Sequence, residues 1–178
     1  MNINKDKTVC FTGHRPEKMP FAPSDTVRLR TLKGLIYSEI TSAIDRGFDT
    51  FITGMQRGVD LWAAEAVMEL SARHKLSLIA ALPYKDMGKG FKGQDKWVFG
   101  RILNRADETV IISDDYTPGC MNKRNRFMVD NSSLLIAVVG DMRSGTGQTV
   151  RYAEKSGIEI CRIDLCGLFP DEDQLTLL

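Results

Sequence analysis

The sequence has few of the residues from which metal sites and disulfide frameworks are built. It contains two histidines and four cysteines in 178 residues, and no two cysteines form a Cys-x-x-Cys pair. Two of the cysteines, Cys10 and Cys161, lie in apolar runs of strand length, so we interpret the set as reduced thiols rather than disulfides or metal ligands. Two histidines are too few for an ordinary zinc site, and we predict no bound metal.

Long apolar runs and an excess of one charge are also missing. No run approaches the roughly 20 apolar residues that span a bilayer, and the opening stretch MNINKDK lacks the apolar segment of a signal peptide. The formal net charge of +1 argues against a protein whose whole surface grips nucleic acid. We therefore expect a cytoplasmic protein with no membrane contact and without nucleic acid as a partner.

The composition is that of a globular protein, with 43% hydrophobic and 26% charged residues, and the length fits one domain over residues 1–178. Strand-like apolar runs alternate with helical patterns along the chain. Strands are expected at 8–13, 50–54, 76–83, 109–113, 134–140 and 158–163. Helices are expected from a cap at Ser24 to Gly47, and at 59–73, 95–106, 121–131 and 147–156. This alternation predicts an α/β, Rossmann-like, doubly wound fold with a mostly parallel sheet and helices on both faces. The tail, 165–178, shows no period.

In such a sheet, ligands bind beyond the carboxyl ends of the strands, and three of the loops expected there are unusual. The loop after the fifth strand contains four residues suited to hold an anion: Ser144, Gly145, Thr146 and Thr149. At a helix start these leave backbone N–H groups and hydroxyls free for a phosphate. The alternative is a glycine-rich turn capped by Thr146. The spacing nearly matches a P-loop but lacks its lysine, and no G-x-G-x-x-G follows the first strand.

The loop after the second strand places Arg57 between Gly54 and Gly58, with Asp60 two residues further on. Arg57 could bind a phosphate or carboxylate through two hydrogen bonds. Asp60 could cap the helix that follows, or could take part in the site.

The loop after the first strand reads Gly13-His14-Arg15-Pro16. We expect Gly13 to let a ligand approach the end of this strand, and Arg15 to supply charge to its phosphate. His14 belongs to the same loop, although a lone histidine more often satisfies a backbone group than catalyses.

The fourth helix opens with cations and amides, among them Arg124 and Asn125, at the ligand end of the sheet. Tyr116, just upstream, could stack on a base or ribose. On periodicity alone, the same stretch is a solvated helix face. The glycine- and lysine-rich segment 88–96 has two interpretations, a mobile surface loop and a lid that closes over a phosphate.

Together these segments resemble the YpsA-like branch of the SLOG superfamily, which includes the DprA and LOG proteins. The resemblance rests on TGHRP, TG-x-x-x-GVD-x-x-A-A-E, P-Y after the third strand, R-N-x-x-MVD in the fourth helix and SGT before the last helix. It implies a Rossmann-like fold and a nucleotide-derived ligand of the ADP-ribose, NAD or nucleoside monophosphate class. It also implies a link to bacterial cell division or stress, and it leaves a homodimer and a protein partner open.

LOG enzymes cleave nucleotides between base and ribose phosphate, and their motifs differ from this chain in a way that bears on catalysis. Their P-G-G-x-G-T-x-E-E carries two acids where this chain has Gln148 and Thr149. A neutral amide cannot replace a carboxylate at an oxocarbenium-like centre. We therefore expect a binding protein or sensor. The alternative is a nucleotide N-glycosidase with a relocated acid, for which Glu65 and Asp60 are candidates. A DprA-like single-strand binder is disfavoured here by charge and by few stacking aromatics.

Overall fold

The computed structural model describes residues 3–170 and contains a six-stranded sheet in which every pairing is parallel. The strand order is β4-β3-β2-β1-β5-β6. The strands are β1 (Thr8–Gly13), β2 (Thr50–Thr53), β3 (Ser77–Leu82), β4 (Glu108–Ile111), β5 (Leu134–Val139) and β6 (Glu159–Asp164). The chain runs outward from β1 through β2 and β3 to β4, then returns to the other side of β1 as β5. This reversal puts a topological switch point between β1 and β5.

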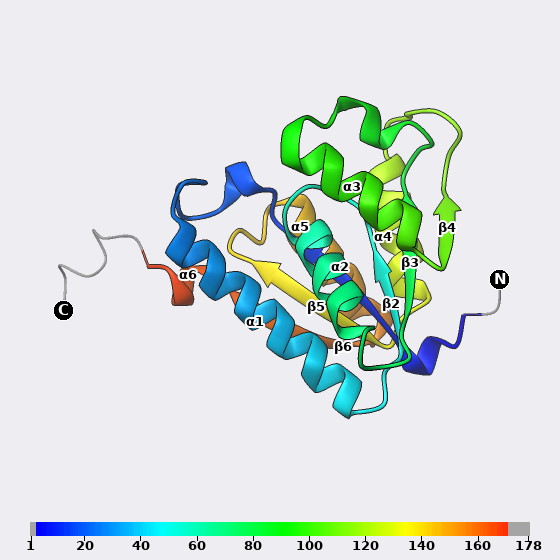
Figure 1. The fold of residues 1–178 in the computed structure, drawn as a ribbon, viewed down its shortest axis with the longest axis horizontal. Coiled ribbons are helices and arrows are strands. Elements are labelled where there is room, and N and C mark those ends of the chain that lie inside the picture. The colour runs from blue at the N-terminus through cyan, green and yellow to red at the C-terminus, as the bar shows by residue number, and fades with distance from the viewer. Residues whose placement is uncertain (1–2, 171–178) are drawn as a thin grey trace.

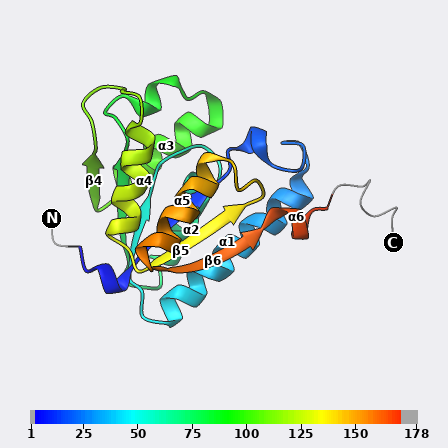
Figure 2. The same cartoon turned by 180° about the vertical axis from the view of Figure 1, so that it is seen from behind.

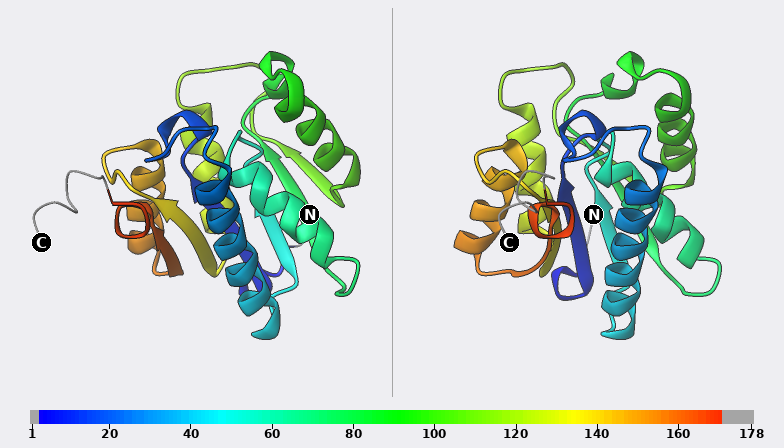
Figure 3. Two further views of the ribbon diagram at one scale, coloured as in Figure 1. Left: turned by 60° about the vertical axis from the view of Figure 1, so that its left-hand side comes forward. Right: turned by 90° about the vertical axis from the view of Figure 1, so that its left-hand side faces the viewer.

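Helices cover both faces of the sheet. They are α1 (Thr26–Asp45), α2 (Val59–Leu70), α3 (Gly93–Arg105), α4 (Cys120–Asp130), α5 (Gly145–Ser156) and α6 (Leu165–Leu168), with short 3-10 turns η1 (Lys5–Lys7), η2 (Pro16–Lys18) and η3 (Met87–Gly90). Helices α1, α2 and α3 lie in front of the sheet in Figure 1, and α4 and α5 lie in front when the molecule is seen from behind in Figure 2. Figure 3 shows the resulting three layers from the side. The predicted α/β Rossmann-like fold is confirmed.

The central strands β1, β2 and β5 are buried almost throughout because helices cover both of their sides. Along β1, Val9 and Phe11 contribute to the core beneath α1, α2 and α3, whereas Cys10 between them contributes to the core beneath α4 and α5. Every residue of β5 is buried. The strand period of two therefore divides one apolar run between two cores.

Several boundaries differ from the sequence-based prediction. The cap of α1 is Asp25 and not Ser24, because the Asp25 carboxylate accepts the Arg28 N–H at 2.9 Å. Segment 88–96 is ordered structure and not a loop: it forms η3 and the first turn of α3, and the ring of Phe91 packs edge-on against Phe99 at 5.3 Å.

The expected tail, 165–178, begins with α6, and its last eight residues lie outside the described part of the chain. The four cysteines are free thiols, and burial raises the pKa of Cys10 to about 12. Within residues 3–170 no group of acids, cysteines and histidines could hold a metal ion. In the same range, the helices are too short or too polar to cross a bilayer.

The glycine at the end of β1 is required for packing. A Cβ at Gly13 would collide with the side chain of Val59 in the first turn of α2. We expected this glycine to let a ligand approach; in the structure its lack of a side chain makes room for α2, and Gly13 also lines the cavity described below.

Gly13→Ala should therefore destabilise the protein by about 1–3 kcal/mol, since the added methyl overpacks the contact between β1 and α2. Gly34→Ala is the matched control, because a Cβ there meets nothing within 4 Å and lies inside α1. The control should raise stability by about 0.5–1 kcal/mol through helix propensity. Urea unfolding of both variants checks the pair, and equal effects would contradict this account of Gly13.

Candidate functional site

A cavity of about 210 Å³ opens at the switch point, beyond the carboxyl ends of β1 and β5. Four segments line it: the end of β1 with the loop that follows, the loop between β2 and α2, the first turns of α4, and the first turn of α5. The predicted site residues in this lining are Gly13, His14, Arg15, Asp60, Arg124, Asn125, Ser144, Gly145 and Thr146. Segments more than 120 residues apart in sequence thus meet because parallel strands all end at one edge.

The first turn of α5 presents backbone donors to this cavity. Ser144 caps the helix: its Oγ accepts the Gly147 N–H at 3.2 Å and donates to the Asp141 carbonyl at 2.5 Å. The alternative of a cap at Thr146 is therefore wrong. Within the described chain, the N–H groups of Gly145 and Thr146 donate to no protein acceptor. A helix start of this kind favours an anion through its free N–H groups and its dipole.

His14 fixes the loop that precedes α5. Its Nε2 accepts the N–H groups of Gly140 and Asp141 at 3.0 and 3.2 Å, and its Nδ1 lies 3.4 Å from the Thr146 hydroxyl. Because Nε2 accepts twice, the ring proton resides on Nδ1 and points to Thr146. Burial, followed by the charge of Lys18, lowers the pKa of His14, while Asp141 opposes the shift. The residue therefore holds the loop that precedes α5 as a neutral ring, and it also lines the cavity.

A buried ion pair forms the floor of the cavity. The Arg124 guanidinium contacts the Asp60 carboxylate at 3.3 Å and donates to the Gly54 carbonyl, with both side chains less than a tenth exposed. Asp60 also accepts the Gln56 N–H at 3.2 Å, so it braces its own loop and does not cap α2. Burial raises the pKa of Asp60 and lowers that of Arg124, and each partner opposes the shift of the other.

Arg124 is not fully satisfied by the protein. Its Nε is buried and has no hydrogen-bond partner among residues 3–170. A buried guanidinium N–H without an acceptor is costly, and Arg124 lines the cavity directly. The Nε itself has almost no surface open to the cavity, so an anion in the cavity would interact with the charge of this arginine and not with its Nε.

The two glycines of the second loop serve this arrangement and not a ligand. A Cβ at Gly54 would lie 2.6 Å from the Asp60 carboxylate and would also collide with Arg124. Gly58 has a φ of +89°, and a Cβ there would lie 2.6 Å from the His14 carbonyl. Between them, Met55 adopts a φ of 59°, which is strained for a side chain of this kind.

Besides Gly54 and Gly58, four predicted residues lie outside the lining of the cavity. Arg57 donates to Asp95 at 2.7 Å and contacts Glu17 at 3.4 Å, so it binds carboxylates of the protein itself. Thr149 is buried, donates to the Gly145 carbonyl and accepts the Asn125 amide.

The other two are Tyr116 and Glu65. Tyr116 packs edge-on against Tyr84 at 5.4 Å and is 65% exposed. Glu65 pairs with Arg101 in a separate hollow between α1, α2 and α3.

Sequence reasoning missed six residues of the lining: Phe11, Thr12, Lys18, Gln56, Met121 and Asn122. Each lies within a few residues of a motif that was recognised, yet none has a side chain that by itself indicates a site. Beside the cavity lies a larger hollow of about 520 Å³, which shares Arg15, Gln56 and Met121 with it and carries the rings of Tyr84 and Phe91. A hollow with aromatic rings, next to a helix start that favours an anion, can accept a base beside a phosphate.

The model for the YspA SLOG family, YpsA, matches residues 9–166 of this chain. The chain belongs to this family. A UPF0398 protein of Bacillus thuringiensis strain Al Hakam is 26% identical over 157 residues, which cover 86% of this chain and 85% of that protein. A UPF0398 protein of Bacillus cereus strain AH187 shows the same figures. The resemblance predicted from the sequence motifs is confirmed.

Two solved structures share the fold of this YpsA-family chain. DNA processing protein A (DprA) of Streptococcus pneumoniae superposes with a TM-score of 0.58 at 16% identity; the match covers 89% of this chain and half of that one. DprA of Helicobacter pylori, described for its unique single-stranded DNA binding mode, gives a TM-score of 0.59 at 18% identity and covers 96% and 74% of the two chains.

The H. pylori structure corrects one prediction. We disfavoured nucleic acid as a partner on the near-neutral charge, and this expectation is overturned, because a protein of the same fold binds single-stranded DNA. Net charge sums over the whole surface, whereas binding depends on the charges gathered at one edge.

Removal of Arg124 from this YpsA-family protein should leave Asp60 buried without a partner. Arg124→Met is therefore expected to lower the free energy of unfolding by about 3–5 kcal/mol. Adding Asp60→Asn removes the unpaired charge and should restore a large part of that stability. Urea unfolding of the single and double variants checks this coupling, and a double variant less stable than Arg124→Met would contradict it.

The lowered pKa of His14 predicts how stability depends on pH. The unfolded chain binds a proton at about pH 6.5, whereas the folded ring does so only at lower pH. Between these two values the unfolded state holds more protons, so stability is full above about pH 6.5 and falls as the pH drops toward the folded pKa. Unfolding midpoints from pH 5 to 8 measure the effect. His14→Gln should flatten this part of the curve, and an unchanged curve would refute the assignment.

Proposed function

We propose that this YpsA-family protein is a cytosolic binding protein, a sensor or regulator, for a nucleotide-derived ligand whose phosphate sits at the start of α5. One combination of features carries the proposal. Two backbone N–H groups without acceptors in residues 3–170, at Gly145 and Thr146, line the same cavity as buried Arg124. The two donors and the charge of the arginine suit the oxygens of a phosphate.

The surroundings favour a nucleotide over a bare phosphate. Arg15 and Lys18 are exposed at the mouth and form no ion pair in the described chain. The cavity and the adjoining aromatic hollow fall together within the roughly 300–1,000 Å³ of small-molecule sites. The phosphate would occupy the cavity, and the base would extend toward Tyr84 and Phe91. ADP-ribose, NAD and nucleoside monophosphates all satisfy this arrangement, with no further cofactor.

The position of the acids favours binding over N-glycosidic cleavage. Glu65 lies in another hollow and pairs with Arg101, so it cannot serve as a relocated acid in this cavity. Asp60 does line the cavity, but its carboxylate is engaged by Arg124 and the Gln56 N–H. Gln148 and Thr149, which stand where LOG enzymes carry acids, are not in the lining of this cavity.

Isothermal titration calorimetry with AMP, ADP-ribose and NAD tests the proposal. Two variants are compared with the wild type: one removes a positive charge and the other adds a negative charge. Arg15→Gln removes a cation at the mouth and should weaken binding about tenfold, or by roughly 1.4 kcal/mol. Gly145→Glu puts a carboxylate where the phosphate would sit, and should abolish binding. A Cβ at Gly145 meets nothing within 4 Å, and an acid in the first turn favours the helix dipole, so the fold should stay at least as stable.

The Arg30→Gln variant on α1, across the sheet, is the control and should bind as the wild type does. A ligand that binds the Gly145→Glu variant as tightly as the wild type would place the site elsewhere. Release of free base from AMP, abolished in Asp60→Asn, would instead favour the glycosidase.

A single strand of DNA is a second candidate, because three hollows adjoin one another. The cavity shares residues with the aromatic hollow on one side and with a hollow between α4 and α5 on the other. Aromatic rings next to cations suit stacked bases and their phosphates, and H. pylori DprA binds single-stranded DNA on the same fold. Fluorescence anisotropy with a labelled deoxyadenosine decamer distinguishes this candidate from a mononucleotide site.

A further inference from the structure

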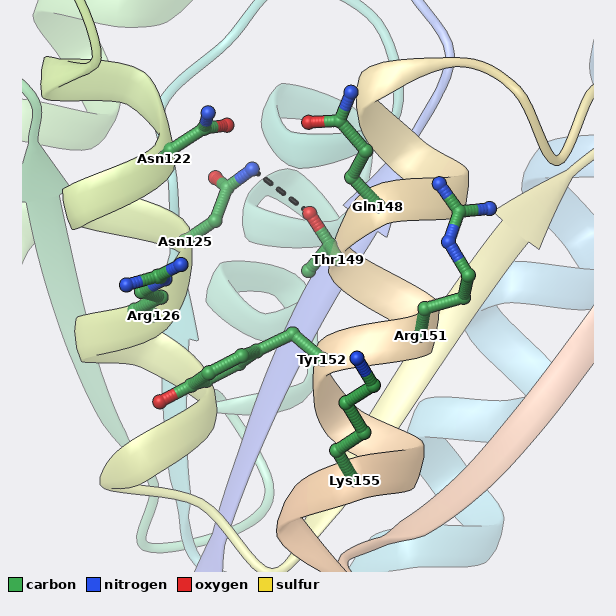
Figure 4. Close-up of a pocket in the computed structure, with 8 residues that line it drawn as sticks. All are labelled: Asn122, Asn125, Arg126, Gln148, Thr149, Arg151, Tyr152 and Lys155. Atoms are coloured by element: carbon green, nitrogen blue, oxygen red, sulfur yellow. Dashed lines mark hydrogen bonds between the residues drawn. The ribbon is translucent and has the colours of Figure 1, made fainter.

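A polar cleft of about 260 Å³ lies between α4 and α5, and is drawn in Figure 4. Its lining carries three cations, Arg126 from α4 and Arg151 and Lys155 from α5, and no acid. Figure 4 shows the amides of Asn122 and Gln148 reaching toward each other from the two helices above these cations. We refer to this hollow as the α4/α5 cleft.

The cations of the α4/α5 cleft are not neutralised by the protein. In residues 3–170 none of the three forms an ion pair, whereas Arg46, Arg57, Arg101, Arg124 and Arg162 all do. Arg126 lies over the ring of Tyr152 at 5.2 Å, and Arg151 donates to the Met142 carbonyl. The nearest acid at the lower end, Asp130, accepts the Tyr152 hydroxyl at 2.8 Å.

Helix electrostatics account for one of these cations only. Lys155 lies in the last turn of α5, where a positive charge favours the dipole. Arg126 and Arg151 lie in helix interiors and have no such role. Both side chains are exposed to solvent and face one cleft whose lining contains no acid, so an anion that enters the cleft would meet a local excess of positive charge.

The α4/α5 cleft adjoins the switch-point cavity. Asn122 and Asn125 line both hollows, and the Asn125 amide donates to Thr149 on α5 at 2.8 Å (Figure 4). Arg151 and Lys155 follow Gly145 by six and ten residues, which is about 9 and 15 Å along a helix that rises 1.5 Å per residue. One phosphate cannot reach both places, whereas a ligand with two separated phosphates can.

We propose that the α4/α5 cleft is a second phosphate subsite, so that the ligand is a phosphodiester-linked chain of at least two nucleotides. The first phosphate sits at Gly145 and Thr146, and the chain continues past Asn125 to the cations of the cleft. This inference rests on the proposed function and extends it, because it requires a ligand larger than a mononucleotide. The same chemistry could come from a dinucleotide or from a nucleic-acid strand.

Three probes of increasing length test the second subsite: dAMP, the 5′-phosphorylated dinucleotide pdApdA, and the decamer d(A)10. The wild type should bind at least one of the longer probes about fivefold or more tightly than dAMP. Arg126→Gln with Lys155→Gln should remove this gain and leave dAMP within about twofold of the wild type, since neither residue lines the switch-point cavity. For each phosphate that the double variant no longer neutralises, the slope of log affinity against log salt should fall by about 0.7.

The matched control is Arg30→Gln with Lys33→Gln on the exposed face of α1. It removes the same two charges from the opposite side of the sheet, so it reports any effect of net charge alone. The control should bind all three probes as the wild type does. Equal weakening in both double variants would overturn the subsite.

The remaining outcomes separate the proposals. A gain with pdApdA supports the subsite with a small-molecule ligand, and a gain confined to d(A)10 supports it with a strand. Equal affinity of the wild type for all three probes would overturn the subsite but would not contradict the first phosphate site at Gly145 and Thr146. Two results would overturn the first phosphate site and the subsite together. They are failure of dAMP to bind, and binding of dAMP to Gly145→Glu as tight as to the wild type.

Discussion

The buried pair of Arg124 and Asp60 is the interaction on which the site depends. Arg124 comes from α4 on one face of the sheet, and Asp60 from the first turn of α2 on the other, so their contact crosses the carboxyl edge of the strands. The same guanidinium holds the Gly54 carbonyl, which fixes the path of the chain out of β2. Because either charge alone would be strongly destabilising in this position, the two loops are held in one arrangement.

The rest of the cavity is built around this floor by neutral contacts. His14 joins the end of β1 to the loop after β5 by accepting two backbone N–H groups, and Ser144 closes the cap of α5. Both interactions satisfy the hydrogen-bonding groups of the loops themselves. The groups that have no acceptor among residues 3–170 are all donors: the N–H groups of Gly145 and Thr146, the Nε of Arg124 and the cations Arg15 and Lys18 at the mouth. The N–H groups and the charges of these three side chains are the features on which the proposed phosphate site rests.

The glycines of these loops have a different structural role from the one expected in a phosphate-binding loop. Gly13 and Gly54 leave room for Val59 and Arg124, which belong to the protein, and Gly58 supplies a backbone angle. Gly145 alone faces open space at the cavity. Substitution of glycines in such loops therefore tests packing at three positions and ligand access at one, a distinction that no sequence motif contains.

The sequence by itself determined the elements and their order. Apolar runs of strand length alternating with helical patterns are a local property, and they dictate parallel pairing with helices on both faces. The loops that carry the site were predictable for the same reason, because every strand of a parallel sheet ends at one edge.

Only the tertiary structure decided what each side chain in those loops contacts. Arg57 and Arg124 look alike in the sequence, yet one pairs with Asp95 and Glu17 and the other forms the buried floor. Glu65 follows Asp60 by five residues, and the turn of α2 carries it into a different hollow. The cations of the α4/α5 cleft lie on the exposed faces of two different helices, and only the packing of α4 against α5 gathers them into one cleft. Contacts between distant segments depend on strand order and helix packing, which the local pattern of residues does not encode.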